Sequence, residues 1–222
     1  MNIIQIDGVT GCYPEQMEGT SEWYFCKEGK ENFCDLYEAE EIFKSKKNFT
    51  GMNCHLIHFP EGTVHSPFRL RDNLYIESPI WDNEKIYFLS VDFCKQTIQI
   101  NCYFPDERRL EMIKELPLDI VEDCYNLMLK TTPLMLCRDA NNGVFEIVWP
   151  ENKDIEIGQT EGLLFRDGED LYFSEWYENP DYHENVIIRD LNTGKVKEKF
   201  EGYLRRLPNG VYWKVQSTNS NL

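Results

Sequence analysis

Three segments of the chain place a tryptophan beside carboxylate and amide side chains, just outside a predicted strand. They are Trp81-Asp82-Asn83, Trp149-Pro150-Glu151-Asn152 and residues 176–183. Sugars bind to such groups, because a ring face packs on an aromatic side chain while hydroxyl groups bond carboxylates and amides. We therefore predict a ligand-binding role for Trp81, Asp82, Trp149, Glu151, Trp176, Glu178, Tyr182 and His183. In the alternative interpretation, the tryptophans pack between sheets and the polar residues cap turns.

Carboxylates are too abundant to assign catalytic residues. Hydrolysis of a glycosidic bond needs two of them, about 5 to 9.5 Å apart. The chain has 39 acidic residues, so some plausible pair is always present. Candidates for such a pair include Asp82, Asp92, Asp139, Glu175 and Glu178. The sequence contains no nucleophile elbow, phosphate-binding loop or dinucleotide-binding glycine motif, so it leaves open whether the protein is an enzyme.

One cluster has residue types that bind metals. In a strand, Cys54 and His58 share a face, and His65 follows after a Pro60-Glu61-Gly62 turn. Thiolate and imidazole groups could ligate zinc, but compact zinc sites need a fourth ligand, and the sequence offers none nearby. We expect no metal and no cofactor.

The charge balance limits the partners. Lys and Arg number 23 against 39 Asp and Glu, which gives a net charge of -16. Such a field repels phosphate backbones and anionic membrane surfaces, so we expect neither nucleic acid nor a membrane as partner. We expect a small polar ligand or a protein partner instead.

The N-terminal residues and the cysteines indicate a cytoplasmic protein. Residues 1–8 lack a basic region followed by a long apolar run, so they do not look like a secretory signal. The eight cysteines include no Cys-x-x-Cys pair. In a reducing compartment we expect them to be free thiols that fill apolar positions in strands.

Short strand-like runs separated by turn residues dominate the chain. The runs at 85–91, 97–104 and 143–149 are rich in aromatic and β-branched residues. The breaks between runs contain Gly, usually after Asp, Asn or Glu, as in Asn142-Gly143 and Asp167-Gly168. These dipeptides supply the positive φ of tight hairpins. Aromatic residues reach 14%, which also favours sheet over a helical bundle.

The runs recur at intervals of about 40 to 50 residues, which is typical of propeller blades with four short strands each. We predict the strands at 22–26, 33–37, 53–59 and 63–68; at 73–78, 85–93, 97–104 and 109–115; at 126–130, 134–138, 143–149 and 154–157; at 162–166, 170–177, 185–189 and 195–200; and at 203–207 and 211–216.

The repeat, best seen in residues 170–200, resembles generic β-propeller blades. It has no Trp-Asp dipeptide at each repeat end and no kelch-type Gly-Gly pair. A count of about five blades resembles small five-bladed sugar-binding lectins and the catalytic domains of some glycoside hydrolases. This resemblance concerns the fold, and a fold alone does not determine function.

We therefore expect an all-β fold, a small five-bladed β-propeller formed by residues 1–222 as a single domain. The fifth blade is short of strands, so we expect residues 2–6 to complete it and close the ring. Residues 36–47, 107–116 and 119–129 have helical character, which keeps an α+β fold or a β-sandwich open as alternatives. The function we expect is a ligand- or protein-binding module; the alternative is a carbohydrate-active hydrolase that uses axial carboxylates.

Overall fold

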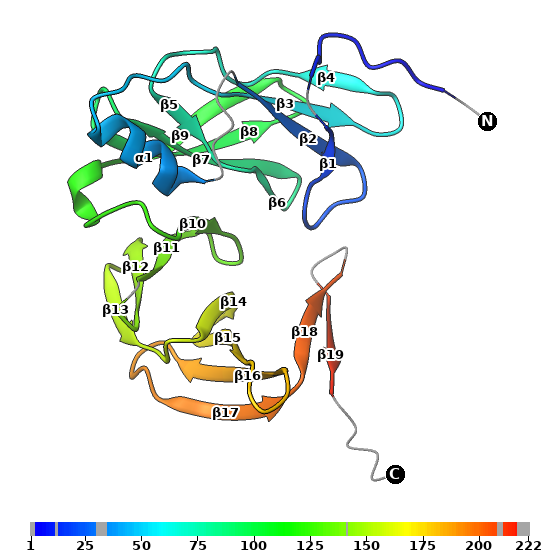
Figure 1. Ribbon diagram of the computed structural model, residues 1–222. Coiled ribbons are helices and arrows are strands. Elements are labelled where there is room, and N and C mark those ends of the chain that lie inside the picture. Colours follow the sequence, from blue (N-terminus) through cyan, green and yellow to red (C-terminus); the bar gives the residue numbers. More distant parts are fainter. Residues whose placement is uncertain (1–2, 12, 30–34, 141, 208–210, 217–222) are drawn as a thin grey trace. The chain divides into compact units, whose positions relative to one another are not determined.

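The computed structural model describes residues 3–11, 13–29, 35–140, 142–207 and 211–216. By its internal contacts the chain divides into two compact units, Met1–Cys124 and Tyr125–Leu222. Small antiparallel sheets follow one another along the chain in both units (Figure 1).

The first unit contains two sheets, in the strand orders β1-β2-β3-β4 and β5-β7-β8-β9. In the second of these, β5 and β6 pair with opposite halves of β7 and together replace one outer strand. The strands of the first unit are β1 (Glu15–Gln16), β2 (Trp23–Glu28), β3 (Asn53–His58), β4 (Thr63–His65), β5 (Leu74–Ile76), β6 (Ile80–Asp82), β7 (Lys85–Asp92), β8 (Thr97–Phe104) and β9 (Arg109–Pro117).

The second unit contains two four-stranded sheets, β10-β11-β12-β13 and β14-β15-β16-β17, and a two-stranded sheet, β18-β19. Its strands are β10 (Leu127–Lys130), β11 (Met135–Ala140), β12 (Val144–Trp149), β13 (Lys153–Glu156), β14 (Glu161–Asp167), β15 (Asp170–Tyr177), β16 (His183–Asp190), β17 (Val196–Glu201), β18 (Tyr203–Arg206) and β19 (Tyr212–Val215).

Each unit is held by a core between its two larger sheets. In the second unit the buried cluster contains Phe145 from one sheet and Phe173 from the other, and their rings meet edge to face at 5.3 Å. In the first unit the corresponding cluster includes Phe88, against which Phe68 packs at 5.0 Å. Strands alternate side chains between two faces, so apolar residues at every second position are enough to build such a core.

The protein is therefore all-β, with a propeller-like arrangement of small sheets, and a generic propeller-like fold is confirmed. The expected count of five blades is wrong: the described residues form four blade-like sheets. The predicted fifth blade is the two-stranded sheet β18-β19. Among the described residues its two strands pair with each other and with no third strand.

The segment expected to complete the last blade is not a strand. Ile3–Ile6 have no strand structure, and residue 2 lies outside the described residues. Ile4 and Ile6 lie against Gly62 in the turn that joins β3 to β4. Apolar contact with this turn thus takes the place of strand pairing.

Helical structure is confined to two short segments of the described chain, α1 (Leu36–Lys44) and the 3-10 turn Leu118–Ile120. Asp35 caps the N-terminus of α1, and its carboxylate accepts a hydrogen bond from the Glu38 N–H at 2.8 Å. The strand predicted at 33–37 is therefore wrong at residues 36–37, and residues 33–34 lie outside the described residues. Residues 107–116 lie largely in β9, and residues 119–129 end in β10.

Six cysteines are described, and all six are free thiols. Five are buried and Cys94 is exposed. Burial raises the pKa of Cys137 to about 12, so this thiol is kept protonated in the core. No described helix has the length and apolar character required to cross a membrane.

Gly202 allows the chain to turn from β17 into β18. Its φ is +119°, and a Cβ there would lie 2.1 Å from the carbonyl oxygen of Val215 in β19. Gly168, in the β14–β15 hairpin, also has positive φ, +58°, but no atom lies within 4 Å of where its Cβ would be. A side chain at either position would therefore be strained by the positive φ, and only at Gly202 would it also clash with backbone.

We expect Gly168→Ala to lower the free energy of unfolding by about 1 kcal/mol, the cost of left-handed backbone. Gly202→Ala should cost about 2 to 3 kcal/mol more, because the clash is with backbone that cannot move independently. Urea unfolding of both variants measures the difference. Equal destabilisation would show that β19 does not pack on Gly202.

Candidate functional site

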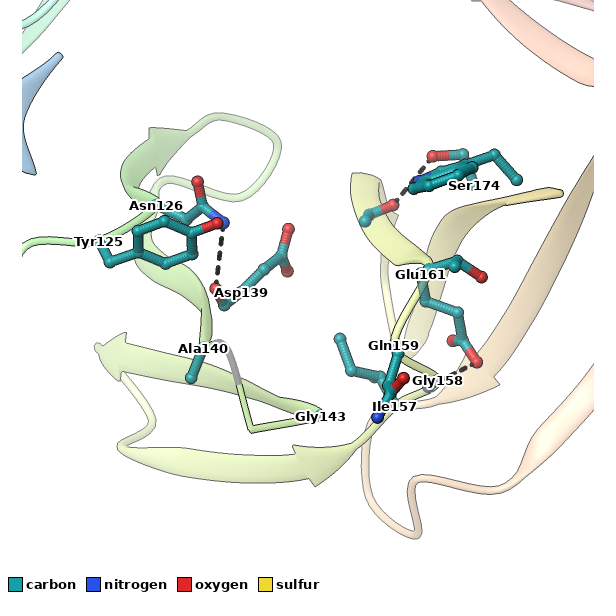
Figure 2. A pocket seen from close by; sticks show the side chains of 13 residues that line it. Tyr125, Asn126, Asp139, Ala140, Gly143, Ile157, Gly158, Gln159, Glu161 and Ser174 are labelled. Carbon is teal, nitrogen blue, oxygen red and sulfur yellow. Dashed lines mark hydrogen bonds between the residues drawn. The ribbon is translucent and has the colours of Figure 1, made fainter. Parts of the chain in front are cut away.

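The second unit contains a cavity of about 560 Å³ lined by residues of both four-stranded sheets (Figure 2). It lies where the strands end: β11 stops at Ala140, and Gly158 to Thr160 connect β13 to β14. Ile157 packs against the core cluster around Phe145 and Phe173 and also lines the cavity, whereas many of the other lining side chains are polar.

Asp139 is the central residue of this cavity. It lies on β11 on the same face as Cys137, which is fully buried, so strand alternation directs its side chain inward. Figure 2 shows its carboxylate directed into the space between the sheets, with Ser174 and Glu161 on the opposite side.

The carboxylate of Asp139 is incompletely hydrogen-bonded. Within the described part of the chain, its Oδ1 atom is buried and has no hydrogen-bond partner. Burial raises the pKa of Asp139, although a hydrogen bond from the backbone of Leu163 and the charge of Lys130 oppose this shift. A buried acceptor without a donor costs about 1 to 3 kcal/mol, which a ligand that donates a hydrogen bond would recover.

Several neighbours can complete a hydrogen-bonding site around Asp139. The Ser174 hydroxyl donates to the Gly162 carbonyl at 3.3 Å and keeps its own lone pairs as acceptors. The Asn126 amide donates to the Asp139 carbonyl oxygen at 3.2 Å, which holds this loop against β11. Tyr125 and Gln159 also line the space.

Glu161 lines the same cavity, but its carboxylate is already hydrogen-bonded within the protein. Arg189 donates to it twice, from Nε at 2.8 Å and from Nη2 at 2.6 Å, and the Gly158 N–H donates at 2.9 Å. Only 3% of its side chain is exposed. This buried, bidentate pair holds the connection between β13 and β14 in place. Glu161 therefore shapes the cavity and is not free to exchange protons with a substrate.

Of the predicted binding residues, Trp176 lies at this cavity. It is 45% exposed, at the end of β15. The exposed connection from β15 to β16 contains Glu178 and Tyr182, and His183 is the first residue of β16. The Tyr182 hydroxyl donates to Glu184, and the His183 ring stacks on Tyr177 with ring centroids 4.9 Å apart. None of these three is among the described lining residues.

The structure does not bring Trp149 and Glu151 to Trp176. Trp149 is the last residue of β12, whereas Gly143, which lines the cavity, directly precedes the first residue of that strand. Glu151 pairs with Arg166 at 2.6 Å, beside the hairpin at the start of β15. Trp176 lies at the other end of that strand.

Trp81 and Asp82 belong to the first unit. Trp81 stacks on Trp23 with ring centroids 6.4 Å apart and packs against the buried cluster there. Asp82 accepts a hydrogen bond from Asn83 at 3.0 Å. These contacts give Trp81 a packing role.

The residues considered for zinc make other contacts. Cys54 is fully buried, His58 bonds Glu61 at 2.8 Å, and His65 bonds the Tyr103 hydroxyl at 2.7 Å. Among the residues described, no three His, Cys, Asp or Glu side chains lie close enough together to hold a metal ion.

From the sequence, Asp139 was one of several candidate acids, and Asn126, Glu161 and Ser174 were not predicted as site residues. The sequence does contain one feature that distinguishes Asp139. In the run Met135 to Asp139, alternate residues are Met, Cys and Asp, so a carboxylate stands at a position that the pattern assigns to the core.

Comparisons with known proteins leave the family open. No family model matches the chain, and no curated protein matches it. One solved structure that matches is the "Crystal structure of Nidogen/Laminin Complex". The matched chain is 18% identical with a TM-score of 0.37, over 67% of this chain and 55% of that chain. A likeness this distant says nothing about the function of this protein, which spans little more than half of the matched chain.

The raised pKa of Asp139 predicts that the free energy of unfolding depends on pH. The native carboxyl holds its proton more tightly than the unfolded one, so stability decreases as pH rises from the ordinary aspartate pKa, about 3.9, through the raised native value. Asp139→Asn removes this loss. We expect the variant to be about 1 kcal/mol more stable than the parent at about pH 7, with the gain vanishing near pH 3.

Urea unfolding at several pH values measures this difference. Asp154→Asn is the matched control, since Asp154 is exposed on β13 of the same sheet and should show no such gain. A variant at Asp139 that is less stable than the parent at neutral pH would show that the native carboxylate is stabilising, the opposite of what its burial predicts.

Proposed function

We propose that this protein is a β-propeller-like binding module that holds a small polar ligand in the cavity of its second unit. The observation that carries the proposal is the half-buried Asp139, whose Oδ1 lacks a hydrogen-bond donor while its side chain lines a cavity of about 560 Å³. A buried polar atom without a partner calls for an explanation, and a ligand that donates a hydrogen bond to it supplies one.

The lining indicates the chemistry of the ligand. None of the described lining residues is Lys, Arg or His, so an anionic ligand would find no counter-charge. Asp139 and Ser174 offer acceptors to hydroxyl or ammonium donors, and the χ2 torsion of an aspartate is soft, so either oxygen can turn to a ligand. Trp176 offers a partly exposed aromatic face. A neutral polyhydroxylated molecule, such as a sugar or polyol, fits all three features.

The geometry favours binding over glycoside hydrolysis. Asp139 and Glu161 are the acids among the described lining residues, and Arg189 neutralises Glu161. A hydrolase needs two carboxylates that act on the same bond, one as acid and one as base or nucleophile. The six free thiols among the described cysteines support the proposal that the module works in a reducing compartment such as the cytoplasm.

A thermal-shift screen against neutral monosaccharides, disaccharides, polyols and amino acids tests this function. A ligand at 100 times its Kd stabilises the fold by about 2.7 kcal/mol, so binders should raise Tm clearly. Trp176→Ala should abolish most of that rise while its own Tm stays within a few degrees of the parent, because Trp176 is 45% exposed.

Trp213→Ala is the matched control, since Trp213 is 59% exposed on β19 and is not a lining residue. It should keep the full ligand-induced rise. The proposal fails if no compound in the panel raises Tm, or if the rise survives in both Trp176→Ala and Asp139→Asn.

A further inference from the structure

A chain of three hydrogen-bonded side chains lies in the first unit, apart from the proposed ligand cavity. Glu28 ends β2, His55 lies on β3, and Ser66 directly follows β4. The His55 Nδ1 atom lies 2.8 Å from the Ser66 hydroxyl oxygen, and its Nε2 atom lies 3.0 Å from Oε2 of Glu28. His55 is 5% exposed, whereas Ser66 is exposed and 45% of the Glu28 side chain is exposed.

The partners of His55 determine its tautomer. An ionised carboxylate only accepts hydrogen bonds, so the bond to Glu28 requires the proton on Nε2. In a neutral imidazole Nδ1 is then an acceptor, and Ser66 donates its hydroxyl proton to it. The Asn53 amide nitrogen lies 3.4 Å from Nε2 but is itself a donor, so it makes no hydrogen bond to Nε2 in this tautomer. The resulting order of hydroxyl, imidazole and carboxylate is that of a nucleophile, its base and the acid that orients the base.

An independent feature, a small pocket, lies beside Ser66. Ser66 also lines a small pocket of about 200 Å³ with His65, Tyr103 and Arg108. Burial is the main cause that lowers the pKa of His65, and the positive charge of the exposed Arg108 adds to that shift. The charge of Arg108 therefore acts on His65, which lines the same pocket as Ser66. A guanidinium next to a nucleophile can stabilise the negative oxygen that forms during acyl transfer.

We propose that Ser66 is the nucleophile of a second site, an esterase for small carboxylic esters. Ser66 Oγ bonds the ester carbonyl carbon as its proton passes to His55 Nδ1, and Arg108 stabilises the oxyanion. The C–O bond to the alcohol then breaks, and His55 returns the proton to the leaving oxygen. Water attacks the acyl-Ser66 ester in the same way, which releases the acid and restores Ser66.

The volume of the pocket limits the acyl group to a few carbons, since about 200 Å³ is below the range of drug-sized sites. Glu28 acts here as a positioning residue, because its carboxylate bonds the His55 ring, whose other nitrogen bonds the Ser66 hydroxyl. This activity is separate from ligand binding in the second unit, and neither depends on the other.

The first test is covalent labelling of the parent protein with a fluorophosphonate, read by intact mass and by peptide mapping. One adduct on Ser66 is expected, together with hydrolysis of p-nitrophenyl acetate. Ser66→Ala should lose the adduct and at least tenfold in kcat/KM. Ser21→Ala, at another exposed serine of this unit, should change neither. Absence of the adduct on Ser66, or equal activity of the two variants, overturns the proposal.

The second test concerns Glu28. Glu28→Gln should slow labelling of Ser66 at least tenfold at an unchanged unfolding midpoint, because an amide no longer requires the proton on Nε2. Glu61→Gln is the matched control, since Glu61 also bonds a histidine, His58, at 2.8 Å. Labelling that is unaffected by Glu28→Gln, or slowed equally by both changes, contradicts the positioning role and with it the site.

Discussion

The packing of two antiparallel sheets on each other in the second unit is the constraint on which the candidate site depends. Phe145 and Phe173 meet between the sheets, and both are fully buried. Because side chains alternate along β11, Cys137 and Asp139 point to the same inward face. Cys137 belongs to the apolar cluster, and Asp139 lies beyond it. The sheets thus hold a half-buried carboxylate where a cavity begins. The first unit uses the same scheme around Phe88, so one packing rule underlies both units.

Much of the fold could be predicted from local patterns. The strands around Asn142-Gly143 and Asp167-Gly168 were predicted within a few residues, because alternating apolar residues and positive-φ turns specify hairpins independently of distant contacts. Prediction failed where tertiary contacts decide. Leu36–Lys44 form a helix capped by Asp35, and Ile4 and Ile6 lie on a turn instead of extending a sheet.

The candidate sites were harder to predict, because each depends on contacts between residues far apart in sequence. Trp176 was found because aromatic residues next to polar ones are conspicuous. Asp139 could not be singled out among 39 acidic residues. The feature that distinguishes it, a buried carboxylate oxygen without a hydrogen-bond donor, arises only in the folded protein. Glu28, His55 and Ser66 come from or follow three different strands, so no spacing in the sequence marks them.

The titration of the Asp139 carboxyl tests most directly whether this residue is held ready for a ligand. Carbon-13 NMR of the protein with labelled aspartate, assigned by comparison with Asp139→Asn, follows this titration with and without a sugar that raises Tm. We predict a pKa above the ordinary aspartate value in the free protein and a shift of the Asp139 signal when the sugar binds. A carboxyl that titrates at or below the ordinary value, with a signal that does not respond to the sugar, would contradict a ligand-binding role for Asp139.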